Sequence, residues 1–369
     1  MRKKESGVNV DTLREWLEED KPVFILDVRP KEQRDEWQIP GSLYLDAYKR
    51  LNEGDASVMD EVTIPKNVEV VTVCAAGKTS EIAANELRKK GIDAHSLEGG
   101  MKGWSLAWNT AALKFENFEI TQVRRTGKGC LSYLISSNNE AAIVDASVSP
   151  EVYEQILAEK NLALEFVIET HIHADHISRA KLLAEKNRVP LYLPVPNKVS
   201  FSFKPVEDGS AFRIGSIEMK AAHTPGHTLE SMCYMIENKV LLTGDTLFID
   251  GVGRPDLKSN EEETNAKSKM LHASLHKLLL LQDDTIILPT HTSKPVNFDH
   301  KPLYATLKTV KTNVAMLQMR EDAFVQTLVQ RIPPTPAYYL TIVEKNLKGD
   351  FSDINPVDLE AGANRCAIS

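Results

Sequence analysis

Cysteine is scarce in this chain: it occurs four times in 369 residues, at positions 74, 130, 233 and 366. Thiols so few and so widely spaced fit a reducing cytoplasm better than a disulfide framework. Long apolar runs are missing too, since the longest aliphatic cluster, residues 278–281, is far too short to span a bilayer. The basic start, M-R-K-K-E-S, is not followed by an apolar segment. The sequence therefore predicts no signal peptide and a cytoplasmic location.

A dense basic stripe is also absent. Lys and Arg number 44 against 52 Asp and Glu, which gives a net charge of −8 and argues against nucleic acid or an anionic membrane as the main partner. The hydrophobic content of 42% is ordinary for a globular protein, and 369 residues suit two domains.

What the chain does have is a dense set of metal ligands. Residues 170–176 read T-H-I-H-A-D-H, directly after the mostly apolar run 164–168. Further along, T-P-G-H-T supplies His227, L-L-T-G-D-T supplies Asp245 and I-I-L-P-T-H-T supplies His291. Each group stands where a strand gives way to a loop, and imidazole with carboxylate suits zinc or iron.

Taken in order, these motifs resemble the metallo-β-lactamase superfamily over roughly residues 113–345, which implies an αββα sandwich with a metal site at one edge. T-H-x-H-A-D-H, T-P-G-H-T and G-D-T-L-F-x-x-G-V-G-R-P-D, the last at residues 244–256, look like the persulfide dioxygenases. Glyoxalase II, a thioester hydrolase, usually carries histidine at the position of Ile172.

The resemblance implies one non-haem Fe(II) per chain, because that family's ligands map onto His171, His227 and Asp245. Such a triad leaves three coordination positions open. The remaining groups would lie in the outer shell or form a second metal site: His173, Asp175, His176 and His291. Spacing alone leaves a two-zinc hydrolase open as the alternative.

Arg254 has two interpretations. The resemblance implies that its guanidinium positions a thiol-bearing substrate, typically glutathione persulfide. The alternative is a loop arginine paired with Asp256.

The first third of the chain holds a second candidate site. The valine-rich run 68–73 predicts a buried strand, and a helical pattern from about Ser80 stops near Gly91. Cys74 thus lies on a strand–loop–helix turn, where backbone N–H groups favour a thiolate or a persulfide.

Four separated motifs in this region resemble the rhodanese (sulfurtransferase) domain over roughly residues 8–110: D-V-R, I-P-G-S, C-A-A-G-K-T-S and L-E-G-G-M-K-G-W. The resemblance makes Cys74 the nucleophile that accepts a sulfane sulfur, with its loop residues Gly77, Lys78 and Thr79 at the substrate. Rhodanese loops commonly read C-R-x-G-x-R, whereas Ala75 and Thr79 stand at the arginine positions here. Because lysine lacks arginine's bidentate grip, we expect a low-charge donor such as glutathione persulfide to be preferred over thiosulfate.

These observations predict an α/β rhodanese domain at 1–112, with a parallel sheet and flanking helices, and an αββα metallo-β-lactamase sandwich at 113–350. A polar tail without regular structure is expected at 351–369, and Cys130 and Cys233 are expected to be packing residues. The predicted function is a bifunctional persulfide dioxygenase and sulfurtransferase that uses persulfide and O2 and handles sulfite or thiosulfate. The alternative is a zinc-dependent, glyoxalase II-like hydrolase whose rhodanese unit transfers sulfur or binds a partner. Dimers are common among such enzymes, and a homodimer is one option.

Overall fold

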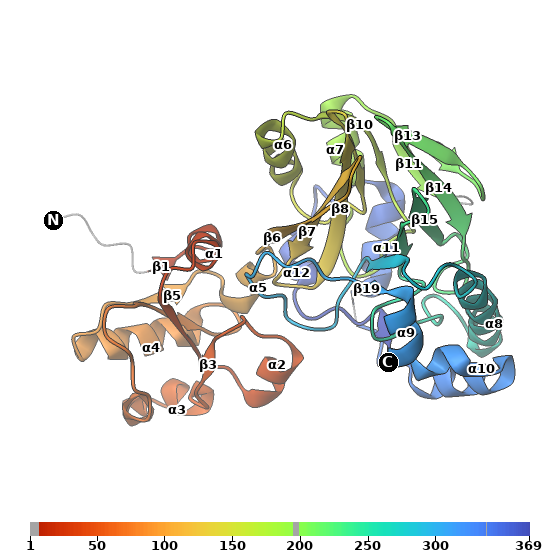
Figure 1. Ribbon diagram of the computed structural model, residues 1–369. Coiled ribbons are helices and arrows are strands. Elements are labelled where there is room, and N and C mark those ends of the chain that lie inside the picture. Colours follow the sequence, from red (N-terminus) through yellow and green to blue (C-terminus); the bar gives the residue numbers. More distant parts are fainter. Residues whose placement is uncertain (1–6, 195–198, 337) are drawn as a thin grey trace.

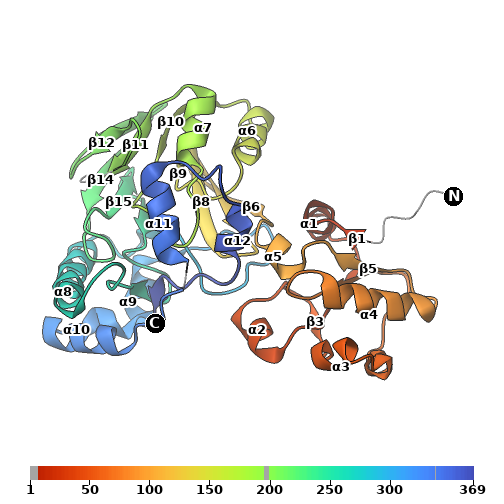
Figure 2. The ribbon, with the colours of Figure 1, turned by 180° about the vertical axis from the view of Figure 1, so that it is seen from behind.

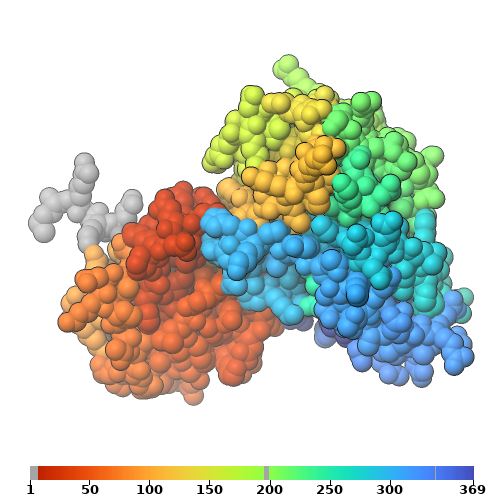
Figure 3. All heavy atoms as spheres, in the orientation of Figure 1, coloured from red at the N-terminus to blue at the C-terminus, as the bar shows by residue number. Residues whose placement is uncertain are grey.

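The computed structural model describes residues 7–194, 199–336 and 338–369, so the basic start lies outside the described residues. Two bodies lie side by side, the N-terminal one built from residues up to about 105 and the larger one from the rest (Figures 1 and 3). Within the described ranges, no helix is both long and apolar enough to cross a membrane.

The N-terminal body is a parallel five-stranded sheet with the order β1-β5-β4-β2-β3. Its strands are β1 (Gly7–Val8), β2 (Val23–Asp27), β3 (Leu43–Tyr44), β4 (Glu69–Val73) and β5 (Ala94–Leu97). Its helices are α1 (Val10–Glu18), α2 (Lys31–Glu36), α3 (Tyr48–Asn52), the 3-10 helix η1 (Ala56–Asp60), α4 (Lys78–Lys89) and α5 (Gly100–Trp104). The valine-rich β4 is the central strand and is covered on both faces, as its sequence predicted.

The larger body holds two sheets packed face to face. The first has seven strands: β6 (Asn109–Lys114), β7 (Glu119–Arg125), β8 (Cys130–Ser137), β9 (Glu140–Val144), β10 (Ala163–Ile168), β11 (Leu191–Pro194) and β12 (Lys204–Val206). The second has six strands: β13 (Ala211–Ile214), β14 (Ile217–His223), β15 (Met232–Ile236), β16 (Val240–Gly244), β18 (Ile286–Pro289) and β19 (Ala305–Thr306). Side chains such as Tyr133, Phe166 and Tyr234 fill the layer between the sheets.

Helices cover both outer faces, which completes the αββα sandwich. Next to the seven-stranded sheet lie α6 (Pro150–Glu159) and α7 (Ala180–Asn187). Next to the six-stranded sheet lie α8 (Glu261–Leu278), α9 (Leu307–Asn313), the 3-10 helix η2 (Ala315–Gln318) and α10 (Glu321–Gln330). The chain closes with α11 (Tyr339–Lys348), α12 (Pro356–Glu360) and β20 (Ala367–Ile368), and β20 pairs with β17 (Val252–Gly253). Both fold predictions, the parallel α/β sheet and the sandwich, are confirmed.

The prediction of an unstructured polar tail at 351–369 is wrong. Residues of this segment form α12 and β20, and Glu360 and Cys366 are buried. The Glu360 carboxylate accepts from Arg125 at 2.6 Å and from Arg179 at 3.2 Å. Composition alone does not predict this structure, because the charge of Glu360 is neutralised by two arginines that are distant in the sequence, Arg125 and Arg179.

The same segment helps to join the two bodies, and α12 lies beside α5 (Figure 2). Arg365 pairs with Glu36 at 3.0 Å, and Lys102 pairs with Asp358. In addition, Arg125 donates from Nε to the carbonyl of Ser105 at 2.7 Å. The bodies therefore pack against each other, as the absence of a flexible linker predicted.

Candidate metal centre and sulfurtransfer site

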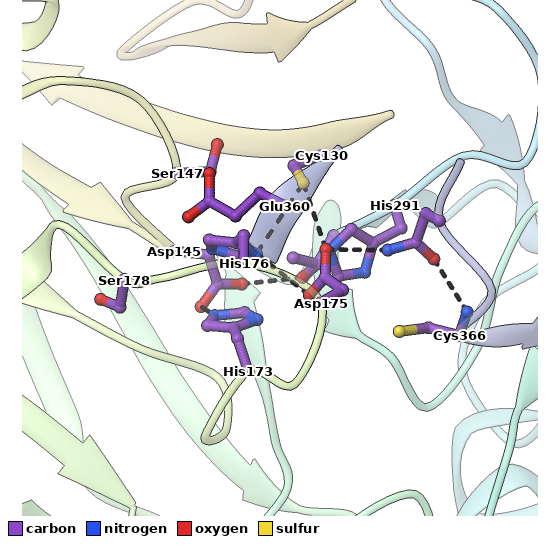
Figure 4. Close-up of polar contacts among 12 residues, drawn as sticks. Cys130, Asp145, Ser147, His173, Asp175, His176, Ser178, His291, Glu360 and Cys366 are labelled. Atoms are coloured by element: carbon purple, nitrogen blue, oxygen red, sulfur yellow. Dashed lines mark hydrogen bonds and ion pairs between the residues drawn. The ribbon is translucent and has the colours of Figure 1, made fainter. Parts of the chain in front are cut away.

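All seven predicted metal-site groups meet at one edge of the sandwich and are buried. They follow the ends of β10, β14, β16 and β18 as His171, His173, Asp175, His176, His227, Asp245 and His291. The side chains form several groups of ligand atoms, two of which share Asp245 and two His291, and the atoms of each group lie within 4.8 Å of one another. Figure 4 shows several of them, with Asp175 pointing toward both His176 and His291.

The first group is the predicted triad of His171, His227 and Asp245. Nε2 of His171 lies 3.7 Å from Oδ2 of Asp245, and Nε2 of His227 lies 3.5 Å from the same oxygen. Neither His171 Nε2 nor Asp245 Oδ2 has a hydrogen-bond partner among the described residues, although both are buried. Buried, unpaired donor atoms at this spacing fit a metal ion that all three side chains can share.

The opposite atom of each triad side chain is held by the protein. Nδ1 of His171 lies 2.9 Å from the Thr170 hydroxyl, and Nδ1 of His227 donates to the carbonyl of Arg254 at 2.7 Å. Oδ1 of Asp245 accepts from His291 at 2.7 Å. Such contacts fix the imidazole tautomer and ring orientation, so the three remaining atoms face the same point.

The turn that carries His227 requires glycine. Gly226 has a φ of +144°, and a Cβ there would lie 2.4 Å from the Cα of Leu271 on α8. The T-P-G-H sequence therefore lets the backbone pass close to the helix while His227 points into the centre.

The protonation states also suit metal binding. Burial lowers the pKa of His171 and of His227, so both rings are neutral and free to ligate. Burial alone would raise the pKa of Asp245, but His291 and the two ligand histidines hold it below its ordinary value.

The second group joins Asp175, His176 and His291 to Cys130, which the sequence analysis treated as a packing residue. That interpretation is wrong: the Cys130 thiol lies 3.3 Å from Asp175 and 3.8 Å from Nδ1 of His176. Burial and Asp175 raise the pKa of Cys130, but the histidines outweigh them and lower it to about 7. His291 bridges the groups, with its nitrogens 2.7 Å from Asp245 and 3.0 Å from Asp175.

His173 lies between the two groups, with its ring centroid 4.3 Å from that of His171 and 4.4 Å from that of His176, and its buried Nδ1 has no hydrogen-bond partner among the described residues. Its Nε2 lies 2.7 Å from Glu169 and 3.2 Å from Asp145. Burial alone would lower the pKa of His173, but the two carboxylates raise it well above its ordinary value. Asp145 was not predicted, although an aspartate directly after the apolar strand β9 is the same signal that identified Asp245.

Arg254 is fully buried, and its guanidinium already has partners. It forms a bidentate pair with Asp256 at 2.8 and 2.7 Å and also donates to Thr335 and to the carbonyls of Pro333 and Arg365. These contacts favour the alternative of a loop arginine paired with Asp256. Through its own carbonyl, Arg254 also orients His227.

The C-terminal segment supplies two further residues that sequence reasoning missed. Cys366 lies within 4.8 Å of Asp245 and His291, and burial with Asp245 raises the pKa of its thiol well above the ordinary value. Asn364 donates to Asp175 at 2.9 Å. No local motif marks either residue, because their role depends on the pairing of β20 with β17.

A cavity of about 520 Å³, a volume typical of small-molecule sites, lies near the centre, although none of the three triad side chains lines it. Its wall includes the neighbours of the ligands, Ile172, Ala174 and Thr228, and apolar side chains such as Leu257. This cavity has room for a small molecule one residue away along the chain from His171 and His227.

In the N-terminal body, Cys74 lies at the end of β4 as predicted and is 2% exposed. Its sulfur accepts from the N–H of Gly77 at 3.2 Å and from the Ser80 hydroxyl at 3.3 Å. Gly77 has a φ of +93° and precedes α4, which begins at Lys78. Lys78 is exposed, whereas Thr79 is buried and bonded to Asn52.

An αββα sandwich with buried His/Asp clusters at its edge defines a metal-dependent enzyme, and the comparisons with known proteins agree. Residues 125–291 match the metallo-beta-lactamase superfamily, and residues 9–107 match the rhodanese-like domain. The probable hydroxyacylglutathione hydrolase glo2 of Schizosaccharomyces pombe is 32% identical over 188 residues, 47% of this chain and 69% of that protein. The chain belongs to the metallo-β-lactamase superfamily and carries a rhodanese-like domain at its N-terminal side.

Another curated relative and two solved structures are also similar to this chain. A hydroxyacylglutathione hydrolase of Francisella tularensis subsp. novicida is 33% identical over 164 residues, which cover 43% of this chain and 61% of that relative's length. Among solved structures, a Staphylococcus aureus metallo-beta-lactamase has a TM-score of 0.58 at 24% identity, covering 64% of this chain and 74% of that one. ETHE1 from Myxococcus xanthus has a TM-score of 0.53 at 25% identity, covering 62% of this chain and 97% of that one.

Proposed function

We propose that this chain oxidises a low-molecular-weight persulfide such as glutathione persulfide with O2, and that it also transfers sulfane sulfur through Cys74. The overall oxidation is balanced by one water: RSSH, O2 and H2O give RSH and sulfurous acid. Iron(II) held by His171, His227 and Asp245 would supply the open coordination positions on which sulfur and oxygen react.

One observation carries the proposal. Two histidine nitrogens and one carboxylate oxygen face a common point, while each atom opposite them is held by a hydrogen bond. This is the two-histidine, one-carboxylate set typical of non-haem iron oxygenases. Among the other candidate ligands, Asp175 contacts His176 and His291 through both of its oxygens, so it offers no free carboxylate oxygen.

The chain's own residues then have defined tasks. Thr170 and the carbonyl of Arg254 hold the two imidazoles in the metal-binding tautomer. The cavity beside Ile172 and Thr228 admits the carrier thiol, and burial of the triad keeps bulk water away. At the other site, Gly77 and Ser80 donate to the sulfur of Cys74 and would stabilise it as a thiolate leaving group.

The test is oxygen uptake by anaerobically purified, iron-loaded protein on addition of glutathione persulfide, with sulfite measured in parallel. We expect uptake matched by sulfite, lost in His227→Gln and kept in His300→Gln, whose side chain is exposed. Absence of uptake by the iron-loaded wild type overturns the proposal.

The second candidate is a zinc-dependent thioester hydrolase, which the names of the curated relatives favour. The same preparations, loaded with zinc, are assayed for hydrolysis of an S-(2-hydroxyacyl)glutathione. Hydrolysis without oxygen uptake would select this candidate. Separately, cyanide-releasable sulfur on Cys74 after incubation with persulfide separates a transferase from a domain that only binds a partner.

A further inference from the structure

We propose that Asn364 limits the metal centre to a single ion by occupying the carboxylate that a second ion would need. The inference rests on the proposed metal centre and concerns how many ions it holds. Asn364 would act as a positioning residue, since it touches Asp175 and none of the three triad side chains.

The two groups of ligands differ in how their carboxylates are used. Both groups hold buried imidazole nitrogens without a hydrogen-bond partner within the described residues, His171 Nε2 in the triad and Nε2 of His176 and His291 in the second group. In the triad, Oδ2 of Asp245 has no partner either. In the second group, both oxygens of Asp175 are engaged: Oδ1 lies 3.0 Å from His176, and Oδ2 lies 3.0 Å from His291. Both oxygens of Asp175 therefore have partners without a metal, whereas Oδ2 of Asp245 does not, so a second ion would find open imidazoles but no open carboxylate at Asp175.

Asn364 adds a further donor to Oδ2 of Asp175, at 2.9 Å. The orientation of its amide is fixed, because Oδ1 of Asn364 accepts from the backbone N–H of Cys366 at 2.8 Å. The NH2 group must then face Asp175. A cation approaching this oxygen meets the positive ends of N–H bonds, in a side chain that is 6% exposed.

The backbone around Asn364 leaves it little freedom to move away. On one side, Glu360 accepts from Arg125 and from the N–H of Ile177, both at 2.6 Å. On the other side, β20 pairs with β17, and Arg254 donates to the carbonyl of Cys366 at 3.0 Å. Displacing Asn364 to admit an ion would break contacts on both sides.

The amide of Asn364, in place of a carboxylate, determines whether a second ion can bind next to Asp175. An aspartate of the same shape would place two carboxylates at the 2.9 Å contact, an arrangement that a cation stabilises. Cys130, His176 and His291 already lie within 4.8 Å of Asp175. Asn364→Asp should therefore complete a second site, and Asn364→Ala should unblock it without adding a ligand.

The experiment counts metal ions rather than activity. Full-length wild type, Asn364→Asp and Asn364→Ala are stripped of metal, reloaded with excess Zn(II), dialysed and analysed for zinc per chain by mass spectrometry. We expect one zinc in the wild type and two in Asn364→Asp, a doubling. Asn355→Asp is the matched control, since it adds the same charge at an exposed cap of α12 and should stay at one.

A second variant shows where the added ion binds. In Asn364→Asp/His176→Ala, the zinc content should return to one, because His176 belongs to the second group only. Circular dichroism on each variant identifies misfolding. If Asn364→Asp does not fold, the test rests on Asn364→Ala, for which we expect more than one zinc per chain.

The outcomes separate this inference from the proposed function. A wild type that retains no metal overturns the metal centre itself. A wild type that retains two ions, or folded Asn364 variants that stay at one, overturns the role of Asn364 and leaves the triad intact.

Discussion

The Cys74 site and the candidate metal centre of this chain are built in opposite ways. The Cys74 site is local: the groups that contact its sulfur come from Gly77 and Ser80, within six positions. The metal centre is assembled from segments between Cys130 and Cys366 and is held by buried charges. A local site such as that of Cys74 should tolerate changes elsewhere in the chain. A site assembled from distant segments, such as the metal centre, should depend on contacts far from the ligands. Five predictions test this difference.

The largest effect is expected at the local site. Cys74→Ser should reduce cyanide-releasable sulfur to background, because a hydroxyl cannot carry a sulfane sulfur, while oxygen uptake with persulfide stays within about twofold. Loading with persulfide followed by cyanolysis measures the first, and an oxygen electrode the second. Cys233→Ser, at a thiol outside both sites, is the control. Retained sulfur transfer in Cys74→Ser would show that another thiol is the acceptor.

The corresponding change at the metal centre is Asp245→Asn. It keeps the shape of the side chain but removes the negative charge that the triad histidines face. The metal affinity should therefore fall by at least about 100-fold, and oxygen uptake should fall with it. Metal content and oxygen uptake are measured together, and Asp250→Asn, on the same loop, should behave as wild type. Sulfur loading of Cys74 should be unchanged; its loss would mean that the two sites are coupled.

Glu360→Gln tests the dependence on distant contacts. Removing the carboxylate leaves Arg125 and Arg179 buried without a counter-charge, which should lower the free energy of unfolding by about 3 kcal/mol at pH 7. Denaturant unfolding measures this, with Glu344→Gln at an exposed pair as a control that should change by less than about 1 kcal/mol.

The pH dependence of this contribution has a definite sign. Burial alone would raise the pKa of Glu360, but Arg125 and Arg179 hold it at about 2, below the ordinary 4.5. A lowered pKa stabilises the fold above pH 4.5, and the contribution is lost as the pH falls from 4.5 toward 2. The gap between wild type and Glu360→Gln should narrow over that window; a constant gap would contradict the ion-pair explanation.

The smallest effects compare one supporting hydroxyl in each site. Thr170→Val removes the partner of His171 Nδ1 and should weaken metal binding about 10- to 100-fold. Ser80→Ala leaves the Gly77 N–H on the Cys74 sulfur, so sulfur transfer should fall by less than about fivefold. Metal titration measures the affinity of Thr170→Val, and cyanolysis measures sulfur transfer by Ser80→Ala. A larger effect in Ser80→Ala than in Thr170→Val would contradict the view that the Cys74 site depends less on a single supporting contact.

The sequence was informative where a pattern is local. Strand β4 follows from the valine run and helix α4 from the helical pattern that stops near Gly91, and the candidate ligands follow from four short motifs. It was uninformative where a residue's role depends on distant partners. Cys130 reads as one more apolar strand residue until β8 is placed beside Asp175, and Glu360 reads as solvent-exposed charge until Arg125 is beside it.

The position of residues 360–368 along the chain has a consequence for synthesis. All seven histidine and aspartate groups of the metal centre, from His171 to His291, emerge from the ribosome before this segment does. Because domains fold in the order of their synthesis, the ligands can gather while the side of the centre next to Asp175 is still uncovered. A metal ion then has an open approach during biosynthesis that the finished protein closes when β20 joins β17. Loading of the nascent chain should accordingly be faster than loading of the completed one.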